Sequence, residues 1–277
     1  MGADSTSALV DLLRARNQAQ PTARGELQVD HFAPEGRIAG KVYAFSAAGG
    51  RLRLEAVSPL DTPVRTMAVD GEHLSIVDQE SRRCLEGRAD PCLVGQAVGV
   101  ELSAVQVATT LTGGIPILRH QDATSRWNEC GWYEVELRGE AEGWSERIRL
   151  APIDGRLVPV HAVIRDRDGV VLEMDLAGHA PAGDLIVARR MVIRMPRSEA
   201  ELRVEWRHIE VGVELPDRAW RTTCPAGFTV EPATCNPSTP LSVLEEPAPP
   251  PVEPAPDAGP PDAEPGAGSD LTEELGL

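Results

Sequence analysis

The residues in this sequence that could do chemistry are few and scattered. Asp166 and Asp168 resemble a pair of catalytic carboxylates, but Gly169 follows them, which is more typical of a hairpin turn. The sequence has no GxSxG elbow, no HExxH motif and no glycine-rich phosphate loop. The histidines lie one to a strand or turn, at His31, His73, His120, His161, His179 and His208. We therefore expect no enzyme and no cofactor.

Five cysteines form neither a CxxC motif nor a Cys/His cluster, so we expect no metal site. Cys84 with Cys92, and Cys224 with Cys235, close short loops whose lengths suit disulfides. These pairings predict an oxidising compartment and leave Cys130 unpaired. Two alternatives stay open: Cys92 pairs with Cys130, or all five cysteines are buried thiols in a reducing cytosol.

The charge is strongly negative and unevenly distributed. The formal net charge is −16, and residues 245–277 carry nine acidic groups and no basic one. The basic residues are arginines and one lysine, Lys41, and they form no cluster that could bind a phosphate backbone. Nucleic acid is therefore not expected as a partner. Residues 245–277 are also rich in Pro and Ala with few large apolar side chains, which predicts a disordered tail.

Hydrophobic periodicity divides the chain into a short helix and two runs of strands. Leu9, Leu12 and Leu13 share one helix face behind Ser7 as N-cap, so residues 1–23 are expected to form a linker and a helix. From Arg24 onward apolar and polar residues alternate, as in half-buried strands. The expected strands are 26–32, 37–45, 51–57, 64–70, 73–78 and 82–85, and then 131–139, 144–150, 156–166, 169–178, 185–195 and 201–213.

Two short helices interrupt the strands over residues 90–113. Asp90 is a suitable N-cap with Pro91 in the first turn, and Ser103 with Gln106 forms a capping box for a second helix. No stretch of the chain reaches the length of a transmembrane helix. A long sheet must cover its apolar face, and the short helices are the elements available to do so.

These elements predict a mainly β fold: a half-open, strongly curved antiparallel β-barrel of about 11 to 12 strands, with short helices plugging its concave side. Aromatic residues make up only 4% of the chain, so aliphatic side chains must line the interior. Such a lining suits a flexible alkyl chain. The expected cavity residues are Leu52, Leu54, Leu74, Ile76, Val98, Val105, Leu111, Val135 and Val160.

Two segments resemble the outer-membrane lipoprotein receptor LolB, in the family that includes the periplasmic carrier LolA. Residues 95–116, GQAVGVELSAVQVATTLTGGIP, are similar to the family's two helices around a small central element. SPLDTP, residues 58–63, is similar to the family's NPLG loop and places Leu60 at its exposed apolar position, with Asp61 where the family has Gly. The resemblance extends over residues 24–118, and over 127–215 by strand order.

We expect four parts: a linker and helix over 1–23, the half-barrel over 24–215 with its plug at 90–113, an extension with a disulfide over 216–244, and the tail over 245–277. The resemblance covers the half-barrel alone and says nothing of the tail. It implies a monomer that binds acylated lipoproteins or lipids, receives them from a periplasmic carrier protein, and releases them into the inner leaflet of the outer membrane. Leu60 would be the membrane probe.

The resemblance also implies a protein on the periplasmic side of the outer membrane, held by a lipidated N-terminal cysteine. Met1 then stands in place of that cysteine and of a removed signal. A rival hypothesis is an envelope structural or adaptor protein whose Pro-rich tail mediates interactions.

Overall fold

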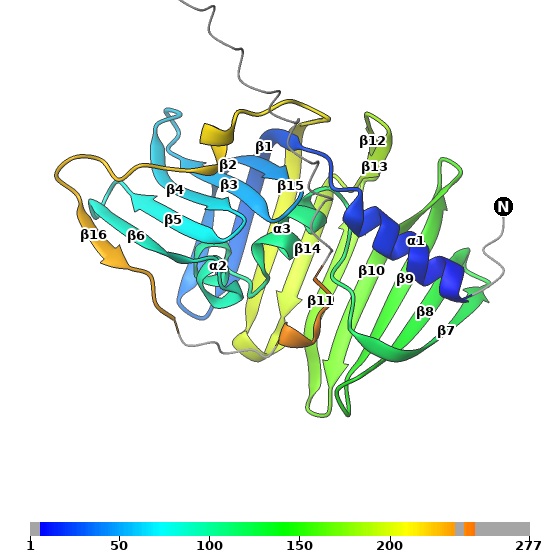
Figure 1. The fold of residues 1–277 in the computed structure, drawn as a ribbon. Coiled ribbons are helices and arrows are strands. Elements are labelled where there is room, and N and C mark those ends of the chain that lie inside the picture. The colour runs from blue at the N-terminus through cyan, green and yellow to red at the C-terminus, as the bar shows by residue number, and fades with distance from the viewer. Residues whose placement is uncertain (1–5, 236–240, 247–277) are drawn as a thin grey trace, which may run out of the picture.

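The computed structural model describes residues 6–235 and 241–246. Within them one long curved sheet of 14 strands dominates, in the order β16-β6-β5-β4-β3-β2-β1-β15-β14-β11-β10-β9-β8-β7, and its two end strands do not meet. Figure 1 shows how the curve wraps around the helices. The strands are β1 (Ala23–Ala33), β2 (Gly36–Ala47), β3 (Arg51–Val57), β4 (Pro63–Asp70), β5 (His73–Asp78), β6 (Arg83–Arg88), β7 (His120–Asn128), β8 (Trp132–Gly139), β9 (Ser145–Ile153), β10 (Arg156–Asp166), β11 (Gly169–Ala177), β14 (Arg190–Met195), β15 (Ala200–Val211) and β16 (Thr229–Pro232).

β1, the first strand in the chain, joins the two halves of the sheet. β1 pairs with β2 on one side and with β15 on the other. The two strands β1 and β15 are therefore neighbours although they lie far apart in the sequence. Every pairing in the sheet is antiparallel except that of β16 with β6. A separate hairpin consists of β12 (Ala180–Ala182) and β13 (Leu185–Val187).

The sequence prediction of a mainly β, curved and open sheet is confirmed, but its strand number was too low. The two missed strands, β7 and β16, are the two ends of the sheet. β7 is mostly polar, and only one of its residues, Ala123, packs against the core. β16 has four residues. Neither strand therefore carries the alternation that marks a half-buried strand.

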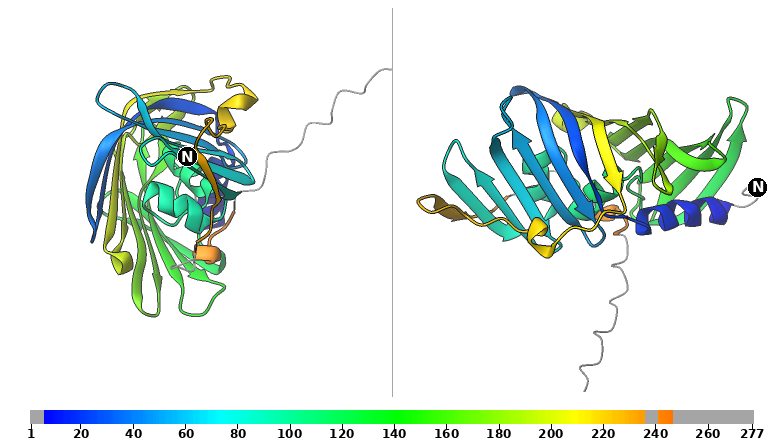
Figure 2. Two further views of the ribbon diagram at one scale, coloured as in Figure 1. Left: turned by 90° about the vertical axis from the view of Figure 1, so that its left-hand side faces the viewer. Right: turned by 90° about the horizontal axis from the view of Figure 1, so that it is seen from above.

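Three helices lie on the concave side of the sheet (Figure 2). α1 (Thr6–Gln18) lies over β7 and β8, while α3 (Ala104–Leu111) contacts β2 and β3. α2 (Pro91–Val98) ends at Gly99 in the left-handed conformation. The predicted capping box of Ser103 and Gln106 is present at the start of α3. None of the described helices is long and apolar enough to cross a membrane.

The C-terminal extension forms a strap around one end of the sheet; we use this name for residues 216–235. It crosses the convex face of β3 and β4, where Trp220 is buried and stacks on Arg51. It then adds β16 to the edge of β6 and continues to α2 on the concave side. Beyond the strap, Leu118 and Leu244 form a β-bridge.

The predicted disulfide pairing is wrong. The strap is joined to the sheet by Cys84–Cys224 and to α2 by Cys92–Cys235. Cys84 points to the convex face of β6, because side chains alternate along a strand and its neighbour Leu85 faces the core. Cys92 lies in α2 on the concave side. The two cysteines are therefore on opposite sides of the sheet and cannot pair. Cys130 is free and exposed.

The first two residues of the predicted tail make contacts with the rest of the structure. Glu245 accepts hydrogen bonds from Arg14 and donates its backbone N–H to the Ile117 carbonyl, and Glu246 accepts one from Ser103. Residues 247–277, for which disorder is predicted, lie outside the described part.

Candidate functional site

Most of the nine predicted cavity residues lie on the concave side of the sheet and in one apolar core. Five are buried in that core: Leu52, Leu74, Ile76, Leu111 and Val135. Leu54 and Val98 are half-buried and pack against it. Val105 and Val160 are also half-buried but lie outside it, because Val105 packs over the β2–β3 turn at Gly50 and Val160 is the bulged residue of β10. The core joins residues from both halves of the sheet.

This interior is filled by side chains of the plug helices and their linkers. Val94 of α2, Leu102 between the helices and Ile115 after α3 are all fully buried. A guest inside the sheet would have to take the place of these side chains. The helices, rather than a second sheet, therefore cover the apolar face.

A carboxyl group lies within the same interior. Glu146 of β9 is 1% exposed, and its Oε2 accepts a hydrogen bond from the Leu118 N–H at 2.7 Å. Burial, with a smaller contribution from the nearby Glu245 carboxylate, raises the pKa of Glu146 from 4.5 to about 8, although the hydrogen bond from Leu118 acts to lower it. The group is therefore largely protonated and uncharged at neutral pH, which suits an apolar surrounding.

The sequence offered no sign of a cleft that the structure forms at the rim of the sheet; we call it the rim cleft. It lies between α2, the β1–β2 hairpin and the β14–β15 turn, and its volume is about 520 Å³. Its polar lining residues are His31, Glu35, Gln96, Glu101 and Ser198. These come from three distant segments of the chain, so no local pattern could reveal them.

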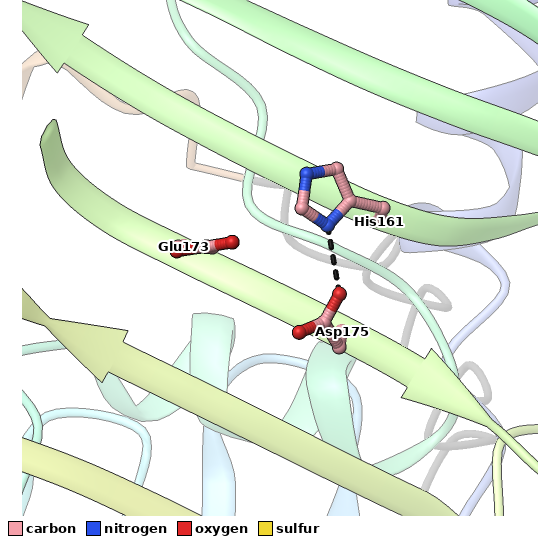
Figure 3. Close-up of side chains that lie close together, drawn as sticks. All are labelled: His161, Glu173 and Asp175. Atoms are coloured by element: carbon pink, nitrogen blue, oxygen red, sulfur yellow. Dashed lines mark hydrogen bonds and ion pairs between the residues drawn. The ribbon is translucent and has the colours of Figure 1, made fainter.

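A second cluster of polar side chains, drawn in Figure 3, lies on the convex face. The ligand atoms of His161, Glu173 and Asp175 are all within 4.8 Å of one another. Arg194 donates to Asp175 Oδ2 at 2.6 Å, and His161 Nδ1 lies 2.8 Å from Oδ1. Burial acts to raise the pKa of Asp175, but these two partners outweigh it and lower the pKa. Arg194 thus already provides the positive charge that the carboxylates need.

Comparison with known proteins identifies the fold. No family model matches the sequence, and no curated protein matches it. A solved DUF1329 family protein from Desulfovibrio piger matches with a TM-score of 0.54 and 12% identity, over 79% of this chain and 98% of its own. A putative outer membrane lipoprotein-sorting protein domain from Vibrio parahaemolyticus matches with a TM-score of 0.55 and 10% identity, over 76% and 94%. A LolA superfamily protein from Nitrosomonas europaea matches with a TM-score of 0.53 and 12% identity, over 79% and 99%.

The chain shares the fold of these three proteins. At identities of 10% and 12% these matches establish the fold alone. They cover about three quarters or more of this chain and nearly the whole of each matched structure. The specific likeness to LolB, as distinct from LolA, stays a prediction.

The turn that resembles the LolB loop presents Leu60 to solvent, with 88% of the residue exposed. Ser58 closes this turn by accepting hydrogen bonds from the Leu60 and Thr62 N–H groups. Asp61, where the family has Gly, adopts a left-handed conformation with φ of 60°. Gly favours this region and Asp tolerates it, so the replacement keeps the turn.

Lys41 of the neighbouring strand β2 pairs with Asp61. Its hydrogen bond lowers the pKa of Asp61, which is therefore ionised and neutralised by the ammonium group. Ile38, three residues before Lys41, is also mostly exposed. An apolar tip beside a balanced ion pair is an arrangement that a membrane surface can accept.

Proposed function

We propose that this protein binds the acyl chains of lipids or lipoproteins, without catalysis, on the concave side of its sheet. It would accept lipoproteins in the bacterial periplasm and deliver them to the outer membrane. The observation that carries the proposal is the continuous apolar core between the sheet and three short helices, in a LolA-superfamily fold. In a purely structural protein, a second sheet or long helices could cover the apolar face of the sheet permanently.

The proposal requires the plug helices to yield to a ligand, with α2 still tied to the strap by Cys92–Cys235. α2 and α3 have eight residues each, too few to be stable as isolated helices. Their stability therefore comes from packing on the sheet, and an alkyl chain can replace those contacts with its own. Each methylene buried in this way contributes about 0.8 kcal/mol, so a long chain offsets the lost packing and transfer needs no energy source.

The proposed partners are acylated lipoproteins or lipids, a periplasmic carrier protein and the inner leaflet of the outer membrane, with the protein acting as a lipid-anchored monomer. The two disulfides support an oxidising compartment such as the periplasm. The exposed turn at Leu60 supports contact with a membrane.

Binding is tested with a fluorescent fatty-acid probe and with native mass spectrometry for co-purified acyl lipid. Leu54→Asp places a charge on the half-buried inner face and should weaken probe binding about tenfold or more. Val230→Asp, on the exposed edge strand β16, is the matched control and should bind as the parent does. If folded Leu54→Asp binds as tightly as Val230→Asp, the acyl site is not on the concave face.

Delivery is tested separately at Leu60. Leu60→Glu should leave acyl uptake unchanged and slow transfer to liposomes, because a carboxylate opposes insertion into the head-group boundary. Val230→Glu controls for added negative charge. Equal delivery by the two variants would refute the membrane-probe role, and lost uptake in Leu60→Glu would place Leu60 at the acyl site instead.

A further inference from the structure

The charged lining of the rim cleft has one sign. Two carboxylates, Glu35 before β2 and Glu101 after α2, border it, while no lysine or arginine is among its described lining residues. Gln96 and Ser198 add neutral hydrogen-bonding groups. Anionic groups are therefore disfavoured in this cleft, and cationic groups are favoured.

The floor of the rim cleft is apolar and continuous with the interior. Val100 and Met195 line the cleft, and both are buried members of the core. Ala200 also lines it and packs against the same core. A volume of about 520 Å³ lies within the range of roughly 300–1,000 Å³ that small-molecule sites occupy. A ligand here could place a polar head between the carboxylates and its alkyl chains over the core.

His31 lies where the cleft adjoins the end of α2. Its ring packs against Gly99 at the end of α2, so closely that a Cβ at Gly99 would lie 2.5 Å from the ring. Its Nε2 is buried and has no hydrogen-bond partner among the described residues. A displacement of α2 would expose this nitrogen beside the cleft, where a ligand's head group could satisfy it.

We propose that the rim cleft binds the ammonium-bearing head group of the acylated ligand, with Glu35 and Glu101 facing the charge and the chains entering over Val100 and Met195. This inference rests on the proposed function, since it names the ligand class of the same interior. An ammonium group next to acyl chains has two sources: an ethanolamine phospholipid, or the free amino end of an acylated polypeptide.

The test is competition against the fluorescent acyl probe at pH 7, where dodecylamine is cationic, dodecanoic acid is anionic and dodecanol is uncharged. Dodecylamine should bind about tenfold more tightly than dodecanoic acid, with dodecanol between them. In Glu35→Gln/Glu101→Gln this preference should fall to about twofold or less. Glu80→Gln, which removes an exposed carboxylate outside the cleft, should retain it.

Two further arms distinguish the sources. Lysophosphatidylethanolamine is compared with lysophosphatidylglycerol, and a diacylglyceryl-cysteine peptide with a free amine is compared with its N-acetylated form. A preference for the amine in either pair, lost in the double variant, supports the proposal and names the source. No preference in either pair overturns it.

Failure of the inference can be told apart from failure of the proposed function. Equal displacement of the probe by dodecylamine and dodecanoic acid, or a preference unchanged in the double variant, overturns the head-group site and leaves acyl binding intact. If the probe does not bind at all, both proposals fail.

Discussion

Glu146 makes the stability of this protein depend on pH in a way that one substitution should remove. Its side chain is 1% exposed in the apolar interior, and its Oε1 has no hydrogen-bond partner among the described residues. Burial raises its pKa to about 8 in the folded protein, from an ordinary value of 4.5. Between these two pH values the folded state holds a proton that the unfolded state has released.

A group whose pKa is raised by folding loses its contribution to stability as pH rises. For Glu146 that contribution is complete below pH 4.5, decreases up to about pH 8, and is then constant. One pKa unit corresponds to about 1.4 kcal/mol, so the free energy of unfolding should fall by about 5 kcal/mol across this window. Glu146→Gln is uncharged in both states and should lose that part of the pH dependence.

The measurement is urea unfolding of parent and Glu146→Gln at pH 5 and pH 8. The parent should lose about 3.5 kcal/mol more than the variant between these two conditions. Glu129→Gln, an exposed carboxylate in the β7–β8 turn, is the control and should follow the parent. Equal losses in parent and Glu146→Gln would show that the carboxyl group is not held uncharged in the interior.

Two more predictions concern α2. Cys92→Ser/Cys235→Ser opens a loop of about 20 residues, because Cys84–Cys224 already joins the same segments, and should lower the free energy of unfolding by about 3 kcal/mol. Urea unfolding measures this, and an unchanged midpoint would mean that the bond does not constrain the unfolded chain. Gly99→Ala should cost about 1 to 3 kcal/mol, because Gly99 has a φ of 85° and the new Cβ would meet the His31 ring. Thermal unfolding checks it, and a variant as stable as the parent would contradict the close packing of α2 on His31.

Local patterns in the sequence predicted the elements that depend on neighbouring residues. Twelve of the fourteen sheet strands were predicted from the alternation of apolar and polar residues, which arises because one face of a strand lies on the core. The start of α3 was predicted from the capping box of Ser103 and Gln106, which are three positions apart. The exposure of Leu60 was also foreseeable, since the turn that presents it is closed by Ser58 two residues earlier. These features require only short-range sterics and hydrogen bonds.

The sequence by itself thus determined a mainly β, open sheet with short apolar helices, because burial periodicity is written into consecutive residues. Only the tertiary structure decided which cysteines meet, since Cys84 and Cys92 are eight positions apart but lie on opposite sides of the sheet. It also decided that Glu146 is buried and that Glu35 and Glu101 border one cleft. Each of these depends on contacts between segments far apart in the chain, and such contacts exist only after the sheet has curved and the strap has closed around its edge.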